Sequence, residues 1–100
     1  MSKMKHTKQE RELMKQMVEY GCVVCRKHYQ VYTPPNIHHF RKGMGMGQRS
    51  RLFIPLCWNH HQHPKHGIHG GTKSWTVKYG TEQELLAYYY ATVEDYLNEI

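Results

Sequence analysis

The sequence lacks three features, and each absence excludes a class of protein. No apolar run approaches the roughly 18 residues that a membrane-spanning helix needs. The basic residues 1–5 are not followed by the apolar segment of a secretory signal. Three cysteines cannot all pair with one another, which argues against a disulfide scaffold. We therefore expect a cytoplasmic protein that has no membrane partner.

Acidic residues are also few, and neither a low-complexity tract nor an internal repeat is visible. The chain has 14 Lys and Arg against 8 Asp and Glu, which gives a formal net charge of +6 at pH 7. An excess this large favours a polyanionic partner, most often nucleic acid. One hundred residues allow a single domain with a modest core, and chains of this length often depend on a bound metal or an oligomer. The oligomeric state itself cannot be read from the sequence.

Helices are predicted near both ends of the chain. Residues 1–6 are expected to form a disordered basic tail, after which a helix begins at Thr7. Its apolar stripe consists of Leu13, Met14, Met17 and Val18. Gly21 is typical of the residue that follows a helix. In the last helix, Thr81 and Glu84 match a capping box. The apolar face that follows comprises Leu85, Leu86, Tyr89, Val93, Tyr96, Leu97 and Ile100.

The middle of the chain predicts extended structure. Residues 37–40 and 52–54 are apolar runs suited to two antiparallel strands, and residues 26–33 could form a further strand. The connecting loop, residues 41–51, is long for a hairpin and contains three alternating glycines. Its cationic side chains are Arg41, Lys42, Arg49 and Arg51. A plain flexible loop needs no cations, so we favour a loop that faces phosphate. A short helix is expected over residues 72–79.

Two pairs of metal-binding residues frame this hairpin. Cys22 and Cys25 are three positions apart, and so are Cys57 and His60. This spacing lets one tight turn supply both ligands of a pair, and three cysteines with one histidine are a common ligand set of structural zinc. We therefore predict a zinc site that ties the N-terminal segment to the middle of the chain. Ordinary buried thiols are the alternative.

A pair of histidines ends the first strand of the predicted hairpin. Adjacent strand residues point to opposite faces, so His38 and His39 cannot serve one task in the same way. A natural division has one of them bind a metal while the other activates water. A module that only binds nucleic acid does not need this arrangement.

These residues together resemble a known family. The frame Cys-x2-Cys, Ile-His-His and Leu-Cys-x2-His-His is similar to the zinc-containing HNH nucleases, also called ββα-metal or His-Me finger nucleases. Closer still are Thr-Pro-Pro-Asn-Ile-His-His (33–39), Gly-Ile-His-Gly (67–70) and Lys-Tyr-Gly-Thr-Glu (78–82). They resemble the phage recombination enhancement nucleases, the Ref family, whose type member cuts DNA in dependence on RecA filaments. The resemblance implies an α+β fold. It would be a single zinc-stapled ββα-metal domain over residues 1–100, with flanking N- and C-terminal helices.

The resemblance also implies roles for three histidines. His39 would be the general base that takes a proton from the attacking water. His38 and His61 would be the first two ligands of a catalytic divalent metal. Histidine ligands accept zinc readily, and magnesium or manganese could also support turnover.

The third ligand of the catalytic metal departs from the usual HNH pattern. It commonly follows one helical turn after the second, where this chain has Lys65, which cannot ligate while it is charged. His69 is the expected third ligand, His66 is the runner-up and His63 is the weakest candidate. The central asparagine of HNH enzymes is absent as well, because Arg51 stands near that place.

The function implied by this resemblance is that of a metal-dependent DNA endonuclease. The cations of the 41–51 loop would hold the DNA backbone. No helix suited to reading a major groove is evident, so low sequence specificity is expected. A RecA filament is a further candidate partner, and the setting would be phage-type recombination or repair in the cytoplasm of a bacterial host. The alternatives are a zinc-stapled nucleic-acid-binding module without turnover and a zinc adaptor for recombination proteins. Only the second set of histidines separates the enzyme from these.

Overall fold

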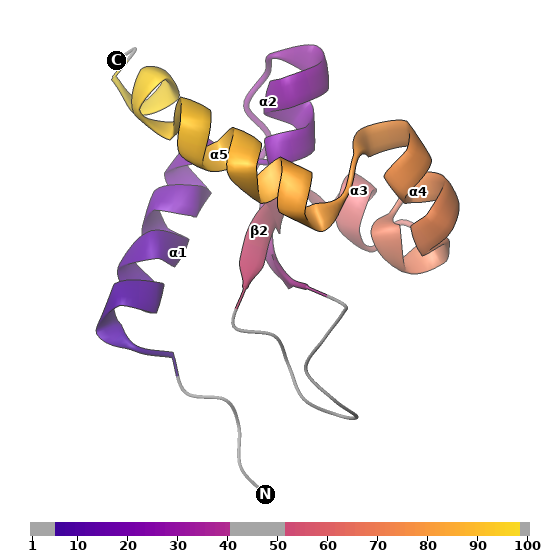
Figure 1. The fold of residues 1–100 in the computed structure, drawn as a ribbon, viewed down its shortest axis with the longest axis horizontal. Helices are drawn as coiled ribbons and strands as arrows, with labels where there is room; N and C mark the ends of the chain where they lie inside the picture. Colours follow the sequence, from indigo (N-terminus) through magenta and orange to yellow (C-terminus); the bar gives the residue numbers. More distant parts are fainter. Residues whose placement is uncertain (1–5, 41–51, 99–100) are drawn as a thin grey trace, which may run out of the picture.

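The computed structural model describes residues 6–40 and 52–98, and these form a small α+β fold (Figure 1). Helices surround a two-stranded antiparallel sheet, so the expected α+β class is confirmed. The elements are α1 (Lys8–Tyr20), α2 (Val23–Tyr29), β1 (Asn36–His39), β2 (Phe53–Leu56), α3 (Trp58–His61), the 3-10 helix η1 (Ile68–Gly70), α4 (Thr72–Tyr79) and α5 (Glu82–Leu97). Residues 1–5 and the predicted phosphate-facing loop, with Arg41, Lys42, Arg49 and Arg51, lie outside the described residues.

Both long helices begin with capping boxes. The Thr7 hydroxyl accepts the backbone N–H of Glu10, and the Glu10 carboxylate accepts the backbone N–H of Thr7. Thr81 and Glu84 make the same pair of bonds at α5, which confirms the predicted cap. A threonine cap of this kind stabilises a helix by about 1 kcal/mol. Gly21 ends α1 with φ of +92°, where a side chain would be strained and would press on the ring of Tyr32.

The hairpin fixes the directions of the two adjacent histidines. His38 pairs with Ile54 and His39 with Phe53 in the antiparallel register. Because neighbouring strand residues face opposite sides, the His38 side chain is buried while that of His39 is only half-buried. All four residues of β2 are buried, whereas His38 is the only buried residue of β1, so β2 is the inner strand of the hairpin.

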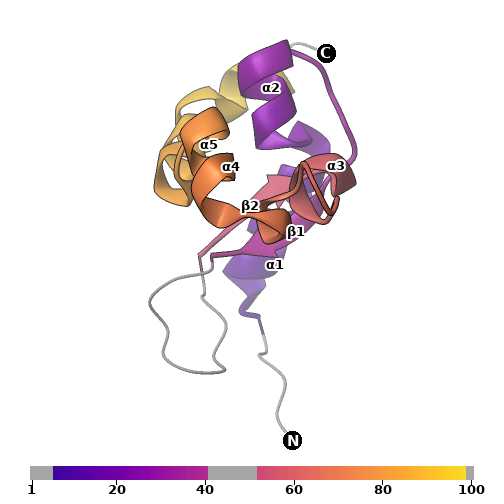
Figure 2. The same cartoon turned by 90° about the vertical axis from the view of Figure 1, so that its right-hand side faces the viewer.

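The core lies between the hairpin and the two long helices. Helix α5 contacts α1, α2 and β2, and it covers one side of the hairpin while α3 lies on the other (Figures 1 and 2). Tyr20 and Tyr89 are fully buried and pack edge to face, with ring centroids 4.8 Å apart. Each phenol oxygen is hydrogen-bonded, Tyr20 to Thr92 and Tyr89 to Gln16, both at 2.8 Å. Buried polar atoms need such partners, so these bonds fix α5 on α1.

The expected strand over residues 26–33 is wrong, because residues 26–29 belong to α2 and residues 30–33 lie in neither a helix nor a strand. Helix α2 continues to Tyr29 and ends at Gln30, which adopts the left-handed conformation with φ of +59°. The tyrosine and valine residues of this segment favour strands, but packing against the rest of the protein decides the conformation of such a short segment.

Among the described helices, none is long and apolar enough to cross a membrane.

Candidate metal centres

Cys22, Cys25, Cys57 and His60 form a buried cluster. The Sγ atoms of Cys25 and Cys57 lie 3.9 Å apart. Nδ1 of His60 lies 3.2 to 3.7 Å from the three sulfur atoms. Around a tetrahedral zinc ion with bonds of about 2.3 Å to sulfur and 2.0 Å to nitrogen, these separations would be about 3.8 Å and 3.5 Å. The donor set and its spacing therefore fit a structural zinc ion.

Two helix starts supply these four residues. Cys22 is the N-cap of α2 and Cys25 lies in its first turn, while Cys57 is the N-cap of α3 and His60 lies within that helix. Interaction with the Cys22 thiol lowers the pKa of Cys57 to about 3 and that of Cys25 to about 6, although burial opposes both shifts, and the pKa of Cys22 is raised in turn. Thiolates are therefore favoured at two positions, and thiolate is the form that binds a metal.

A second cluster is made by His38, His61 and His69, whose candidate ligand atoms lie within 4.8 Å of one another. The ring centroids are 5.0 Å apart for His38 and His61, 5.4 Å for His38 and His69, and 4.8 Å for His61 and His69. The three residues come from β1, α3 and η1 in turn. His38 and His61 are buried, whereas His69 is exposed. The cluster is thus reachable from solvent on one side, as a centre that must meet a substrate has to be.

His61 carries the clearest sign that this cluster could hold an ion. Its Nδ1 is buried and has no hydrogen-bond partner among the described residues. Burial, and to a smaller extent the charge interactions with His38 and His69, lowers the pKa of His61 to about 4. The ring is therefore neutral at pH 7. A buried, unpartnered imidazole nitrogen is costly, and coordination of a metal would satisfy it.

Close backbone packing brings His69 to this cluster. A Cβ atom at Gly67 would lie 2.7 Å from the backbone of His61, and one at Gly70 would collide with the carbonyl oxygen of Pro64. Glycine at these two positions lets η1 approach α3 closely. The exposed His69 thereby lies next to the buried His61.

Glu82 completes the surroundings of His38. Its Oε2 lies 2.7 Å from Nε2 of His38, and both side chains are buried. In the sequence, Glu82 is the last residue of a stretch that resembles the family, and no role is predicted for it. An acidic residue in the first turn of a helix is common, so the sequence held no signal for a contact that spans 44 positions.

His39 lies on the same strand as His38, but it belongs to neither cluster as grouped among the described residues. Its ring is 5.6 Å from that of Phe53, and its Nε2 lies 3.3 Å from Nε2 of His6. Arg11 donates a hydrogen bond to the carbonyl oxygen of His6 and fixes that residue just before α1. The N-terminal segment therefore reaches the expected general base, a contact that the sequence did not indicate.

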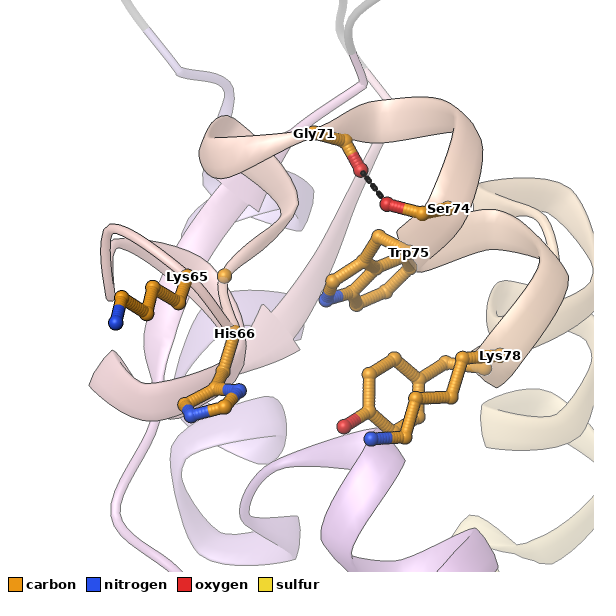
Figure 3. Close-up of a pocket in the computed structure, with 8 residues that line it drawn as sticks. Lys65, His66, Gly71, Ser74, Trp75 and Lys78 are labelled. Atoms are coloured by element: carbon orange, nitrogen blue, oxygen red, sulfur yellow. Dashed lines mark hydrogen bonds between the residues drawn. The ribbon is translucent and has the colours of Figure 1, made fainter.

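The two other candidates for the third ligand lie elsewhere. Nδ1 of His63 accepts hydrogen bonds from the backbone N–H groups of Lys65 and His66, at 3.0 Å and 3.2 Å. The lone pair of this nitrogen is therefore used to stabilise the turn. His66 lines a neighbouring cavity of about 110 Å³. Figure 3 shows Lys65 and His66 on one side of this cavity and Ser74, Trp75 and Lys78 on the other. Acidic side chains are absent from the described residues that line it, so its wall is cationic.

Fold and clusters together define a small α+β protein with a Cys3His centre and a neighbouring three-histidine centre. Residues 6–94 match the model of the family described as recombination enhancement, RecA-dependent nuclease. The match covers most of the chain, so the protein belongs to this family. The predicted resemblance is thereby confirmed at the level of the family, whose name indicates a nuclease that acts in recombination.

Proposed function

We propose that this protein is a metal-dependent DNA endonuclease of the HNH type that hydrolyses phosphodiester bonds with low sequence specificity. The main support for this proposal is the three-histidine cluster in a member of a nuclease family. One of its residues, His38, is followed directly in the sequence by His39. A zinc ion held by the Cys3His cluster would stabilise the single domain. The reaction would belong to phage-type recombination in a bacterial cytoplasm, on DNA that RecA has coated.

The three histidines would hold a divalent metal through ring nitrogens. When bound there, the ion would polarise the scissile phosphate and stabilise negative charge on the departing 3′ oxygen. Three nitrogen ligands suit zinc or manganese better than magnesium, which prefers oxygen. The exposed side of the cluster at His69 would admit the phosphate, while burial of His38 and His61 excludes water behind it.

His39 would act as the general base. It would accept a proton from a water molecule as the water oxygen attacks phosphorus, the bond from phosphorus to the 3′ oxygen breaks, and that oxygen gains a proton from solvent. A neutral imidazole is suited to this task near pH 7. The opposite facing of His38 and His39 on β1 supports the division of labour, since His38 belongs to the three-histidine cluster and His39 lies outside it.

Contacts to the DNA backbone would come from cations around this centre. Lys65 and Lys78 line the cavity next to the turn that carries His69, and the net charge of the chain is +6. The predicted contacts from the 41–51 loop remain a proposal. Phosphate contacts give affinity without sequence choice and make it depend on salt. They support the expectation of low sequence specificity.

A zinc-stapled nucleic-acid-binding module without turnover is the second candidate function. The Cys3His cluster and the cationic cavity fit that module equally well. The three-histidine cluster does not, because a second site with a buried and unpartnered ring nitrogen has no use in simple binding.

Incubation of the full chain with circular single- and double-stranded DNA would test the nuclease function. Zinc, manganese or magnesium is added in turn, with and without a RecA filament on the DNA. We expect nicking or linearisation that requires a metal and is strongest when RecA is present. Salt-sensitive binding without any cut under all of these conditions would favour the binding module instead.

Replacing His69 and His66 in turn would distinguish the two main candidates for the third ligand. His69→Ala is expected to lose the second metal per chain, because it removes one of three ligands. His66→Ala removes an imidazole from the same connection between α3 and η1 but no ligand of the cluster, so it should keep both metals. The metal content of each purified variant is measured after dialysis against a slight excess of zinc. Retention of two metals by folded His69→Ala would contradict the assignment.

A further inference from the structure

A buried carboxylate contacts the three-histidine centre. Glu82 is the first residue of α5, and its side chain is only 9% exposed, against 1% for His38. The 2.7 Å contact between its Oε2 and Nε2 of His38 joins α5 to β1. Burial of a carboxylate costs several kcal/mol unless the group is paired and hydrogen-bonded, so this contact needs a reason.

Helix capping does not supply that reason. The neighbouring Glu84 closes the capping box with Thr81 while fully exposed to solvent. Glu82 lies on the other side of the helix start and turns inward. The partial positive charge at the start of α5 makes a carboxylate tolerable there but does not require its burial.

The contact determines which nitrogen of His38 carries a proton. Nε2 of His38 must donate to the carboxylate oxygen, so in the neutral ring Nδ1 bears the lone pair. The His38 ring also lies against the rings of His61 and His69. Histidines that bind metals commonly donate their other ring N–H to a carboxylate, which fixes the tautomer and orientation of the ring and raises its basicity.

We propose that Glu82 is a positioning residue for the three-histidine centre: it holds His38 with the proton on Nε2, so that Nδ1 is presented to a divalent metal. The role rests on the proposed catalytic centre. Glu82 acts through His38 and is not itself a ligand, because the group of residues whose ligand atoms converge consists of the three histidines.

Metal titration of the full chain tests this role without any measurement of cleavage. Cobalt or zinc is added to the wild type, Glu82→Ala and Glu82→Gln, and the affinity for the second equivalent is measured in competition with a chelator. We expect Glu82→Ala to weaken that affinity 10- to 100-fold, the usual effect of losing such a partner. Glu82→Gln should lose less, because its amide oxygen still accepts the His38 N–H. Glu84→Gln, an exposed change two positions away, is the matched control and should bind as the wild type does.

The tautomer of His38 gives a second readout that a merely structural role would not move. Long-range proton–nitrogen spectra of the ring, recorded with only the first equivalent of zinc bound, should show the proton on Nε2 in the wild type. Glu82→Ala should show a mixture of tautomers. If a folded Glu82→Ala protein kept both the affinity and the single tautomer, the positioning role would be refuted. A wild type that binds one metal only would instead refute the three-histidine centre, and the role of Glu82 with it.

Discussion

Cys22→Ser is expected to leave the protein largely unfolded and without its full zinc content. Cys22 is completely buried, and its Sγ lies 3.7 Å from Nδ1 of His60. A zinc site of this type contributes on the order of 10 kcal/mol to folding. The stability of a whole domain is about 5 to 15 kcal/mol, so loss of one of the four ligands removes much of what keeps this chain folded.

Circular dichroism and zinc analysis of the purified protein would measure both effects. Val24→Ala is the matched control, because Val24 lies between the two cysteines and is equally buried but offers no ligand. It should lose only the stability that follows from trimming two methyl groups, and it should keep its zinc. Removal of zinc from the wild type with a chelator should reproduce the unfolding of Cys22→Ser. A folded Cys22→Ser protein with one zinc per chain in this site would refute the structural role.

Local patterns explain why parts of this fold could be predicted from the sequence. The capping box of Thr81 and Glu84 depends on two residues three positions apart, and it forms as expected. The two metal-binding pairs also lie within single turns, and the structure brings their four residues into one cluster. Patterns of this kind can be recognised in the sequence, because the spacing of the residues within one turn already determines whether their side chains can meet.

Contacts between distant segments account for what the sequence could not predict. The hydrogen bond of Glu82 with His38 and the contact of His6 with His39 span 44 and 33 positions. No local sequence pattern around Glu82 or His6 indicates which distant residue it contacts. The choice between His66 and His69 had the same difficulty, because it depends on how closely η1 packs against α3. Helix α2 was missed because its β-prone residues follow a turn that the two cysteines share.

His39→Ala is expected to abolish cleavage while leaving the rest of the protein in place. Loss of a general base typically slows a reaction 10²- to 10⁴-fold. His39 is half-buried and lies outside both clusters of candidate ligands, so the variant should fold and keep its metals. Its affinity for DNA should persist, since the proposed contacts to the DNA backbone come from cations elsewhere. Single-turnover cleavage, DNA binding and metal content are measured on the same preparation.

The matched control for this change is His28→Ala. His28 is an exposed histidine on α2 whose ring lies 3.4 Å from the carbonyl oxygen of Tyr79, and it belongs to neither cluster. It should cleave at the wild-type rate, which shows that loss of an imidazole alone is harmless. A folded, metal-bound His39→Ala protein that cuts as fast as His28→Ala would mean that another group takes the proton. His6 would then be the first residue to replace, because its Nε2 lies 3.3 Å from Nε2 of His39.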